Sequence, residues 1–251
     1  MGKFSGLLLC SDFDGTLQSG HVISQNNLDA VRYFQENGGR FTLSTGRYPT
    51  ILQEPWATVS VNAPMVAMNG ALIYDLETEK RLYEGTLSED ATPLLERACA
   101  SLEGINEIEI CMSEQWGSVS RLPHDPGDLS SLLRQHPYKV IFRVNKEHSE
   151  ALCRQLAEVA GDRYVVSRSW NAGIEWIGAD FDKGKTVRRL AAMLGADQLI
   201  CVGDYENDLS MIRAADVGVA MGNAVDCLKQ AADRITASVD EDGVARLIYS
   251  L

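Results

Sequence analysis

The residues of this chain best suited to chemistry are two aspartates that follow an apolar run, Leu7–Cys10. Asp12 and Asp14 are separated by one residue and continue into Gly-Thr. Two carboxylates so close together can bind a hard cation, or one can attack an electrophile while the other transfers protons. An acidic turn held by local hydrogen bonds is the alternative without chemistry. An EF-hand calcium loop is excluded, because that pattern requires Gly and Glu where the chain has Leu17 and Ile23.

Three further stretches carry chemically useful groups. Ser44-Thr45-Gly46-Arg47 offers hydroxyls and a backbone amide that can hold a phosphoryl oxygen, although an ordinary helix cap also explains these residue types. Gly203-Asp204-Tyr205-Glu206-Asn207-Asp208 gathers acids in one turn, and the preference of acids for a helix start explains only part of this. Lys183, before Gly184, supplies a cation that a phosphoryl group would need, although a lone lysine is usually solvated.

Short apolar runs that alternate with helical patterns must position these groups. The predicted strands are Leu7–Cys10, Arg40–Leu43, Met65–Met68, Gln198–Val202 and Val217–Ala220. The predicted helices are Asn26–Asn37, Pro49–Thr58, Lys185–Leu194, Asn207–Ala214 and Ala224–Ala232. This alternation predicts an α/β fold with a doubly wound parallel sheet. Ligands bind such sheets at the carboxyl ends of the strands, where Asp12, Asp14 and Asp204 are expected.

The segment 82–182 interrupts the alternation and is predicted to be an inserted α/β domain, so that 1–81 and 183–251 form the core domain. Its strand-like pieces are Ile108–Met112, Lys139–Val144, Tyr164–Ser167 and Gly173–Ile177, and its helix-like pieces are Thr92–Leu102 and Ser149–Ala160. The sequence therefore predicts two domains, with one inserted into the other.

Composition excludes several classes of function. The formal net charge of −12 gives a surface that repels nucleic acid and anionic membranes. No stretch reaches the roughly 18 apolar residues that a membrane span requires, and no signal segment is recognised. The six cysteines are scattered without metal-ligand spacing, which favours reduced thiols. We therefore expect a cytoplasmic protein without nucleic-acid or membrane partners, and nothing in the sequence implies a protein partner.

Taken in order, these motifs resemble those of the haloacid dehalogenase-like hydrolase superfamily, specifically its Cof-like phosphatases. The resemblance covers essentially the whole chain, and it includes Asn69-Gly70 and Gly222-Asn223 beside the stretches above. It implies a Rossmann-like core with a large inserted α/β cap. It also implies a Mg²⁺-dependent phosphatase, a phosphoric monoester hydrolase, that acts on a small phosphorylated metabolite such as a sugar phosphate through an aspartyl-phosphate.

The resemblance further implies a role for each matching residue. Asp12 would be the nucleophile and Asp14 the acid/base. Mg²⁺ would be bound by Asp12, the backbone carbonyl of Asp14 and Asp204, with support from Asp208. The phosphoryl oxygens would be held by the side chains of Thr45, Lys183 and Asn207 and by the amides of Phe13 and Gly46. Lys183 is preferred to Lys185 because the family's lysine directly precedes a glycine.

The inserted domain would select the substrate by closing over the phosphate site. Candidate contacts are Trp116, Arg121, Arg143, Glu175 and Trp176, although packing or a solvated charge explains each of them more simply. Arg47 either contacts substrate or pairs with a nearby acid. A phosphotransferase resembling phosphomannomutases and a phosphorylatable module resembling receiver domains are the alternatives, but receiver modules are usually much shorter and lack a cap.

Overall fold

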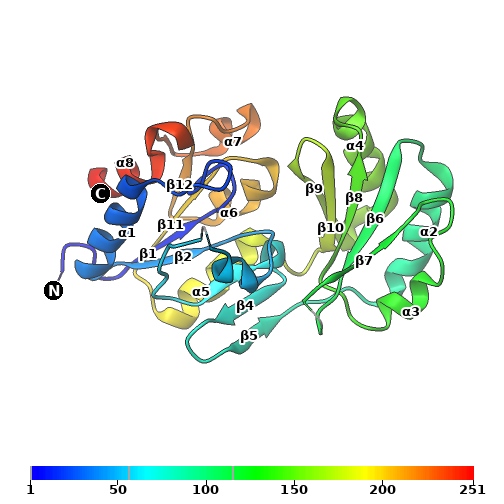
Figure 1. Cartoon of the computed structure of the whole chain (residues 1–251), viewed down its shortest axis with the longest axis horizontal. Coiled ribbons are helices and arrows are strands. Elements are labelled where there is room, and N and C mark those ends of the chain that lie inside the picture. Colours follow the sequence, from blue (N-terminus) through cyan, green and yellow to red (C-terminus); the bar gives the residue numbers. More distant parts are fainter. Residues whose placement is uncertain (1, 56, 115) are drawn as a thin grey trace. The chain divides into compact units, whose positions relative to one another are not determined.

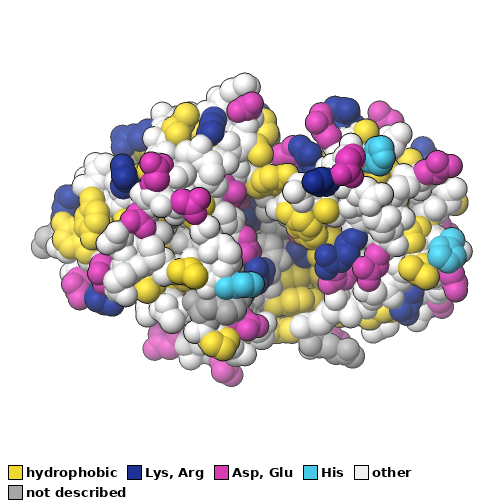
Figure 2. All heavy atoms as spheres, turned by 45° about the horizontal axis from the view of Figure 1, so that its top comes forward, with side chains coloured by type: hydrophobic (Ala, Val, Ile, Leu, Met, Phe, Trp, Pro, Cys, Tyr) yellow, Lys and Arg dark blue, Asp and Glu magenta, His cyan; other side chains and the backbone are white. Residues whose placement is uncertain are grey.

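The computed structural model describes residues 2–55, 57–114 and 116–251, which form two compact units. The core unit comprises Met1–Glu84 and Lys183–Leu251, and the inserted unit comprises Gly85–Asp182. Leu82, where we placed the start of the inserted domain, lies instead in a strand that pairs within the core unit. None of the described helices is both long and apolar enough for a membrane span. Figure 2 shows acidic side chains scattered over both units, in agreement with the net charge of −12.

The core unit is built on a parallel sheet in the order β13-β12-β11-β1-β2 (Figure 1). Its strands are β1 (Leu7–Ser11), β2 (Arg40–Leu43), β11 (Gln198–Gly203), β12 (Val217–Ala220) and β13 (Arg234–Ile235). In the central strand, Cys10 is paired with Cys201 of β11 on one side and with Thr42 of β2 on the other. The predicted parallel α/β fold is therefore confirmed.

Helices flank this sheet, with α1 packed against α8 and α5 against α6 (Figure 1). They are α1 (Gln25–Glu36), α5 (Lys183–Leu194), α6 (Leu209–Ala214), α7 (Asp226–Ala231) and α8 (Gly243–Ser250). Helix α1 begins where the Ser24 side chain accepts a hydrogen bond from the backbone N–H of Asn27. Ala30, Val31 and Phe34 form its buried face at helical spacing.

Two predicted elements of the core unit differ from the structure. Met65–Met68 was expected in the parallel sheet, but β3 (Met65–Ala67) pairs antiparallel with β4 (Leu72–Asp75), which in turn pairs with β5 (Lys80–Glu84). A single parallel bridge from Val66 to Ser44 links β3 to the end of β2. The helix expected over Pro49–Thr58 is a 3-10 helix over Pro49–Gln53, and Trp56 lies outside the described residues.

The inserted unit is an antiparallel sheet in the order β7-β6-β8-β10-β9 with helices on one face (Figure 1). Its strands are β6 (Ile105–Cys111), β7 (Ser118–Arg121), β8 (Lys139–Val144), β9 (Tyr164–Trp170) and β10 (Gly173–Gly178), and its helices are α2 (Thr92–Ser101), α3 (Leu129–Leu133) and α4 (Ser149–Ala160). Alternate residues of β8, Val140, Phe142 and Val144, join the hydrophobic core of this unit.

Candidate active site

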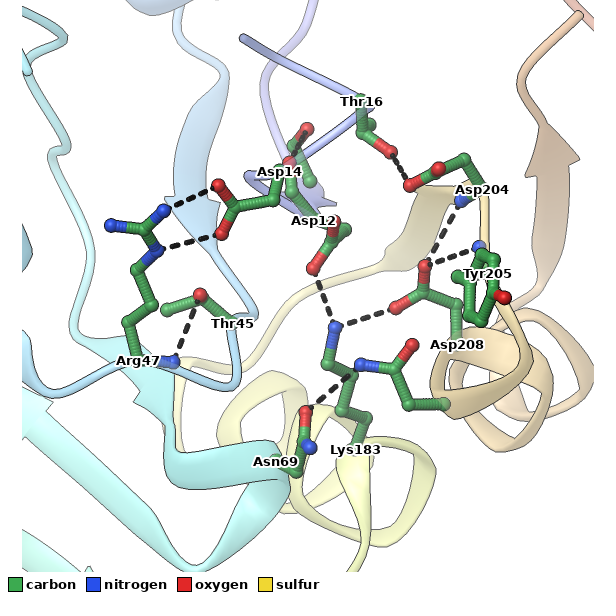
Figure 3. Close-up of polar contacts among 12 residues, drawn as sticks. Asp12, Asp14, Thr16, Thr45, Arg47, Asn69, Lys183, Asp204, Tyr205 and Asp208 are labelled. Atoms are coloured by element: carbon green, nitrogen blue, oxygen red, sulfur yellow. Dashed lines mark hydrogen bonds and ion pairs between the residues drawn. The ribbon is translucent and has the colours of Figure 1, made fainter. Parts of the chain in front are cut away.

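Three neighbouring parallel strands bring the predicted site residues to one edge of the core sheet (Figure 3). Asp12 follows β1, Thr45 follows β2 and Asp204 follows β11. The N–H of Asp12 donates to the carbonyl of Val202 at 2.9 Å, which extends the pairing of β1 with β11 up to the aspartate. The topology of the sheet therefore gathers side chains that are far apart in the sequence.

Lys183 connects two acids of this edge. Its Nζ atom lies 2.6 Å from Oδ1 of Asp12 and 2.6 Å from Oδ1 of Asp208. The side chains of Lys183 and Asp208 have no exposed surface, whereas Lys185 is exposed on the same helix. A buried lysine is stable only when its charge is paired, as it is here twice.

Asp208 also organises the loop that carries Asp204. Its Oδ2 atom accepts hydrogen bonds from the backbone N–H groups of Asp204 at 3.0 Å and Tyr205 at 3.2 Å. A Cβ atom at Gly203 would lie 2.5 Å from the same oxygen, so the loop requires glycine there. Sequence reasoning gave Asp208 only a supporting role, and the structure shows that it links Lys183 to the Asp204 loop.

Residues of the Asp-x-Asp-Gly-Thr motif that follows β1 also contact Asp204. The Thr16 hydroxyl donates to Oδ1 of Asp204 at 2.9 Å. Gly15 has φ +80°, and a Cβ atom there would lie 2.5 Å from Oδ2 of Asp204. Thr16 was not among the predicted site residues, although its position in the Asp-x-Asp-Gly-Thr pattern could have indicated that it belongs to the site.

The electrostatics of this cluster favour a cation. Oxygen atoms of Asp12, Asp204 and Asp208 lie within 4.8 Å of one another. Burial, and then the charge of Asp208, raises the pKa of Asp12 well above its usual value and that of Asp204 to about 7. Burial alone would lower the pKa of Lys183, but the charges of Asp12 and Asp208 outweigh it and raise that pKa.

The donor set fits Mg²⁺. Three carboxylates face one ammonium group, which leaves an excess of negative charge when all are ionised. Oxygen donors of this kind are those that Mg²⁺ prefers. Both oxygens of Asp208 are engaged by Lys183 and the loop amides, so Asp12 and Asp204 are the members of the cluster best placed to bind the ion.

Asp14 has a different environment from Asp12. Its carboxylate receives two hydrogen bonds from the Arg47 guanidinium, both at 2.7 Å, and a third from the side-chain amide of Gln18 at 2.8 Å. The Asp14 side chain is 48% exposed, whereas that of Asp12 is 9% exposed. Of the two roles considered for Arg47, pairing with an acid is therefore observed.

Three of the residues predicted to hold phosphoryl oxygens, Thr45, Gly46 and Asn207, lie around Asn69. The side-chain amide of Asn207 donates to Oδ1 of Asn69 at 3.2 Å, and a Cβ atom at Gly46 would lie 3.2 Å from that same oxygen. The Thr45 hydroxyl accepts a hydrogen bond from the N–H of Arg47 at 3.1 Å, which holds this turn in shape. The other two predicted contacts are Lys183 and Phe13. The side chain of Phe13 is fully buried.

The structure separates the substrate candidates of the inserted unit. Trp176 is fully buried in the hydrophobic core of that unit and acts in packing. Glu175 forms a buried ion pair with Lys139 at 2.7 Å. Arg143 is partly exposed and lies 2.6 Å from Glu109.

Comparison with known proteins identifies the family to which this chain is similar. A family model described as haloacid dehalogenase-like hydrolase matches residues 9–248. The Bacillus subtilis phosphatase YwpJ is 30% identical, over 97% of this chain and 99% of its own. The 5-amino-6-(5-phospho-D-ribitylamino)uracil phosphatase YitU of the same organism is 28% identical, over 96% of each chain.

Solved structures of haloacid dehalogenase-like hydrolases have the same fold as this chain. A haloacid dehalogenase-like hydrolase from Bacteroides thetaiotaomicron superposes with a TM-score of 0.74 at 26% identity, covering 99% of each chain. A haloacid dehalogenase-like hydrolase from B. subtilis superposes with a TM-score of 0.79 at 24% identity, over 97% of this chain and 99% of its own. The chain therefore belongs to the haloacid dehalogenase-like hydrolases, within the Cof-like group that the sequence motifs resemble.

Proposed function

We propose that the protein is a Mg²⁺-dependent phosphomonoester hydrolase that acts on a small phosphorylated metabolite through an aspartyl-phosphate on Asp12. The observation that carries the proposal is the buried Asp12–Lys183–Asp208 arrangement, with Asp204 beside it, at the carboxyl edge of the sheet. The phosphatase names of relatives that align along nearly the whole chain support it.

Asp12, Asp204 and the backbone carbonyl of Asp14 would hold Mg²⁺. When bound, the ion neutralises negative charge on the carboxylates and on the phosphoryl group, which permits their close approach. The cluster of oxygen atoms within 4.8 Å supports this assignment for the two carboxylates.

In the first half-reaction, a carboxylate oxygen of Asp12 attacks phosphorus while the bond to the leaving oxygen breaks. Asp14 gives a proton to that leaving oxygen. Lys183 donates a hydrogen bond to Oδ1 of Asp12. This contact orients the attacking carboxylate and places a positive charge beside the phosphoryl oxygens. Thr45, Asn207 and the amides of Phe13 and Gly46 would bind these oxygens as well.

In the second half-reaction, Asp14 takes a proton from water, which attacks the phosphorus of the aspartyl-phosphate. The bond between phosphorus and Asp12 breaks, phosphate leaves, and the Asp12 carboxylate is restored. The exposure of the Asp14 side chain supports this assignment, because water and product must both reach it.

The inserted unit would select the leaving group. The relative YitU is named for a substrate with a phosphorylated ribityl chain, which supports a hydroxylated leaving group for this protein too. Our candidate for a contact to such a group is Arg143, whose side chain is 47% exposed. It is paired with Glu107, which lies opposite it in β6, and with Glu109, two residues further along that strand.

The test compares the two aspartates, with p-nitrophenyl phosphate and Mg²⁺ present. Asp12→Asn should abolish covalent phosphorylation, because an amide is a poor nucleophile. Asp14→Asn should still be phosphorylated, because p-nitrophenolate scarcely needs protonation, but it should stall after about one product per site without a base to activate water. Intact-mass analysis should find one added phosphoryl group on Asp14→Asn and none on Asp12→Asn.

Two results would contradict the proposal. One is phosphoryl transfer to the Asp12→Asn variant, and the other is undiminished turnover by Asp14→Asn. Release of inorganic phosphate by the wild-type protein identifies a hydrolase, whereas transfer to an added sugar hydroxyl without phosphate release identifies a phosphotransferase.

A further inference from the structure

Gln18 is a buried polar residue beside the proposed acid/base. The residue is 1% exposed, and its Nε2 atom donates to Oδ1 of Asp14 at 2.8 Å. Its backbone closes the turn that follows Asp12, because the Gln18 N–H donates to the carbonyl of Phe13 and its carbonyl accepts from the N–H of Gly15, both at 3.0 Å. The amide is therefore held in place by the same loop that carries Asp14.

Packing alone does not account for an amide at this position. Among the residues that the structure describes, Oε1 of Gln18 is buried without a hydrogen-bond partner. Burial of an unpaired carbonyl oxygen destabilises a folded protein, and an apolar side chain of the same length would avoid that penalty. The feature that only an amide supplies here is the donor to Asp14.

The two groups that hold Asp14 differ in rigidity. The side chain of Arg47 is 39% exposed and has a long flexible stem. Gln18 is enclosed and approaches the carboxylate from within the protein. Proton transfer needs a donor and an acceptor held within hydrogen-bond reach of the reacting oxygen. The buried amide is better suited than the guanidinium to fix one orientation of the carboxylate.

We propose that Gln18 is a positioning residue that orients the Asp14 carboxylate for proton transfer. This inference rests on the function proposed above and assigns to Gln18 no contact with substrate. It predicts that loss of the amide slows the steps that use Asp14 and spares the steps that do not. With p-nitrophenyl phosphate, dephosphorylation of Asp12 uses Asp14, whereas phosphorylation scarcely does.

The experiment replaces Gln18 with methionine, which has nearly the same length and no donor. The matched control is Gln25→Met, because Gln25 also donates through Nε2 to an aspartate four residues away, Asp29, at 2.9 Å, but on the exposed surface of α1. Rapid-quench kinetics with p-nitrophenyl phosphate give the two rate constants separately, and calorimetry gives the melting temperature.

We expect Gln18→Met to slow dephosphorylation about tenfold, the effect of losing one hydrogen bond to a charged group, and to leave phosphorylation within about twofold. The phosphoenzyme should accumulate. The melting temperature should not fall, because methionine removes the unpaired buried oxygen. Gln25→Met should match the wild-type protein in both rate constants.

Equal loss in both rate constants, or no loss in either, would overturn the inference and leave Gln18 a residue of the loop's packing. Should the methionine variant not fold, Gln18→Asn gives the same test, because it keeps an amide but shortens the side chain by one methylene. Failure of the wild-type protein itself to form a phosphoenzyme would count against the proposed function, which is a distinguishable result.

Discussion

Replacement of Lys183 by methionine tests the electrostatic design of the site, because it leaves two buried carboxylates without their shared cation. Nζ of Lys183 lies 2.6 Å from an oxygen of both Asp12 and Asp208, and the lysine side chain has no exposed surface. Removal of one partner from a buried ion pair typically costs about 3–5 kcal/mol. For a chain of this size, that loss corresponds to a melting temperature lower by roughly 6–20 °C.

The loss should depend on pH in a defined direction. Burial, and then the charge of Asp208, already raises the pKa of Asp12 above its ordinary value of 3.8, and removal of Lys183 takes away the main opposing charge. The folded variant then binds a proton that the unfolded chain releases above about pH 4, so its stability falls as pH rises from that point. The deficit relative to wild type should therefore be smaller at pH 5.5 than at pH 8.

Calorimetry in chelator-treated buffer at these two pH values measures the effect. The control is Lys185→Met, which removes the same charge from an exposed position on α5. With Mg²⁺ and p-nitrophenyl phosphate, kcat/KM of Lys183→Met should fall by about 10²-fold or more, the scale seen when one preorganised donor is lost. A melting temperature and kcat/KM that both match those of Lys185→Met would refute the reasoning.

Three further predictions concern the metal and the inserted unit. Gly15→Ala should weaken Mg²⁺ binding at least about tenfold in calorimetric titration, because the new Cβ atom would lie 2.5 Å from Oδ2 of Asp204. The control Gly20→Ala should leave Mg²⁺ binding unchanged, because Gly20 also has a positive φ, +61°, but its Cβ atom would point into open space. Because the pKa of Asp204 is raised to about 7, Mg²⁺ must displace a proton from this carboxyl at low pH. The affinity of the protein for Mg²⁺ should therefore be about tenfold lower at pH 6 than at pH 8, and protons should be released on binding. A Mg²⁺ affinity that does not change with pH would contradict this. Arg143→Ala should change the ranking of kcat/KM among sugar phosphates, while Arg154→Ala, which removes another exposed arginine paired with a glutamate, should leave the ranking unchanged.

Elements with a strong local pattern could be predicted from the sequence. Arg40–Leu43, Val217–Ala220 and Ser149–Ala160 have the predicted bounds, because runs buried on both faces and a strongly amphipathic helix are recognisable from neighbouring residues alone. The motifs that contain Asp12, Thr45 and Asp204 were equally recognisable, since each directly follows a strand. Parallel pairing of those strands then suffices to bring Asp12 and Asp204 to one edge.

Elements whose stability comes from distant contacts were missed. β5 (Lys80–Glu84) is largely exposed and charged, and it forms only because β4 is available to pair with it. α8 (Gly243–Ser250) is short and is stabilised by packing against α1 from the opposite end of the chain. The antiparallel direction of β3 was likewise missed, because an apolar run has the same composition in either direction.

The fold class and the candidate site residues could therefore be predicted from the sequence, because local residue patterns and the order of the strands indicate both. The partners of the charged groups in the candidate site, in contrast, could be found only in the folded structure. Lys183 donates hydrogen bonds to Asp12 and Asp208, and Arg47 donates hydrogen bonds to Asp14. These partners are so far apart in the chain that no local sequence pattern indicates the pairing. A side chain's hydrogen bonds depend on positions to within a fraction of an ångström, and those positions are set by the packing of the whole unit around it.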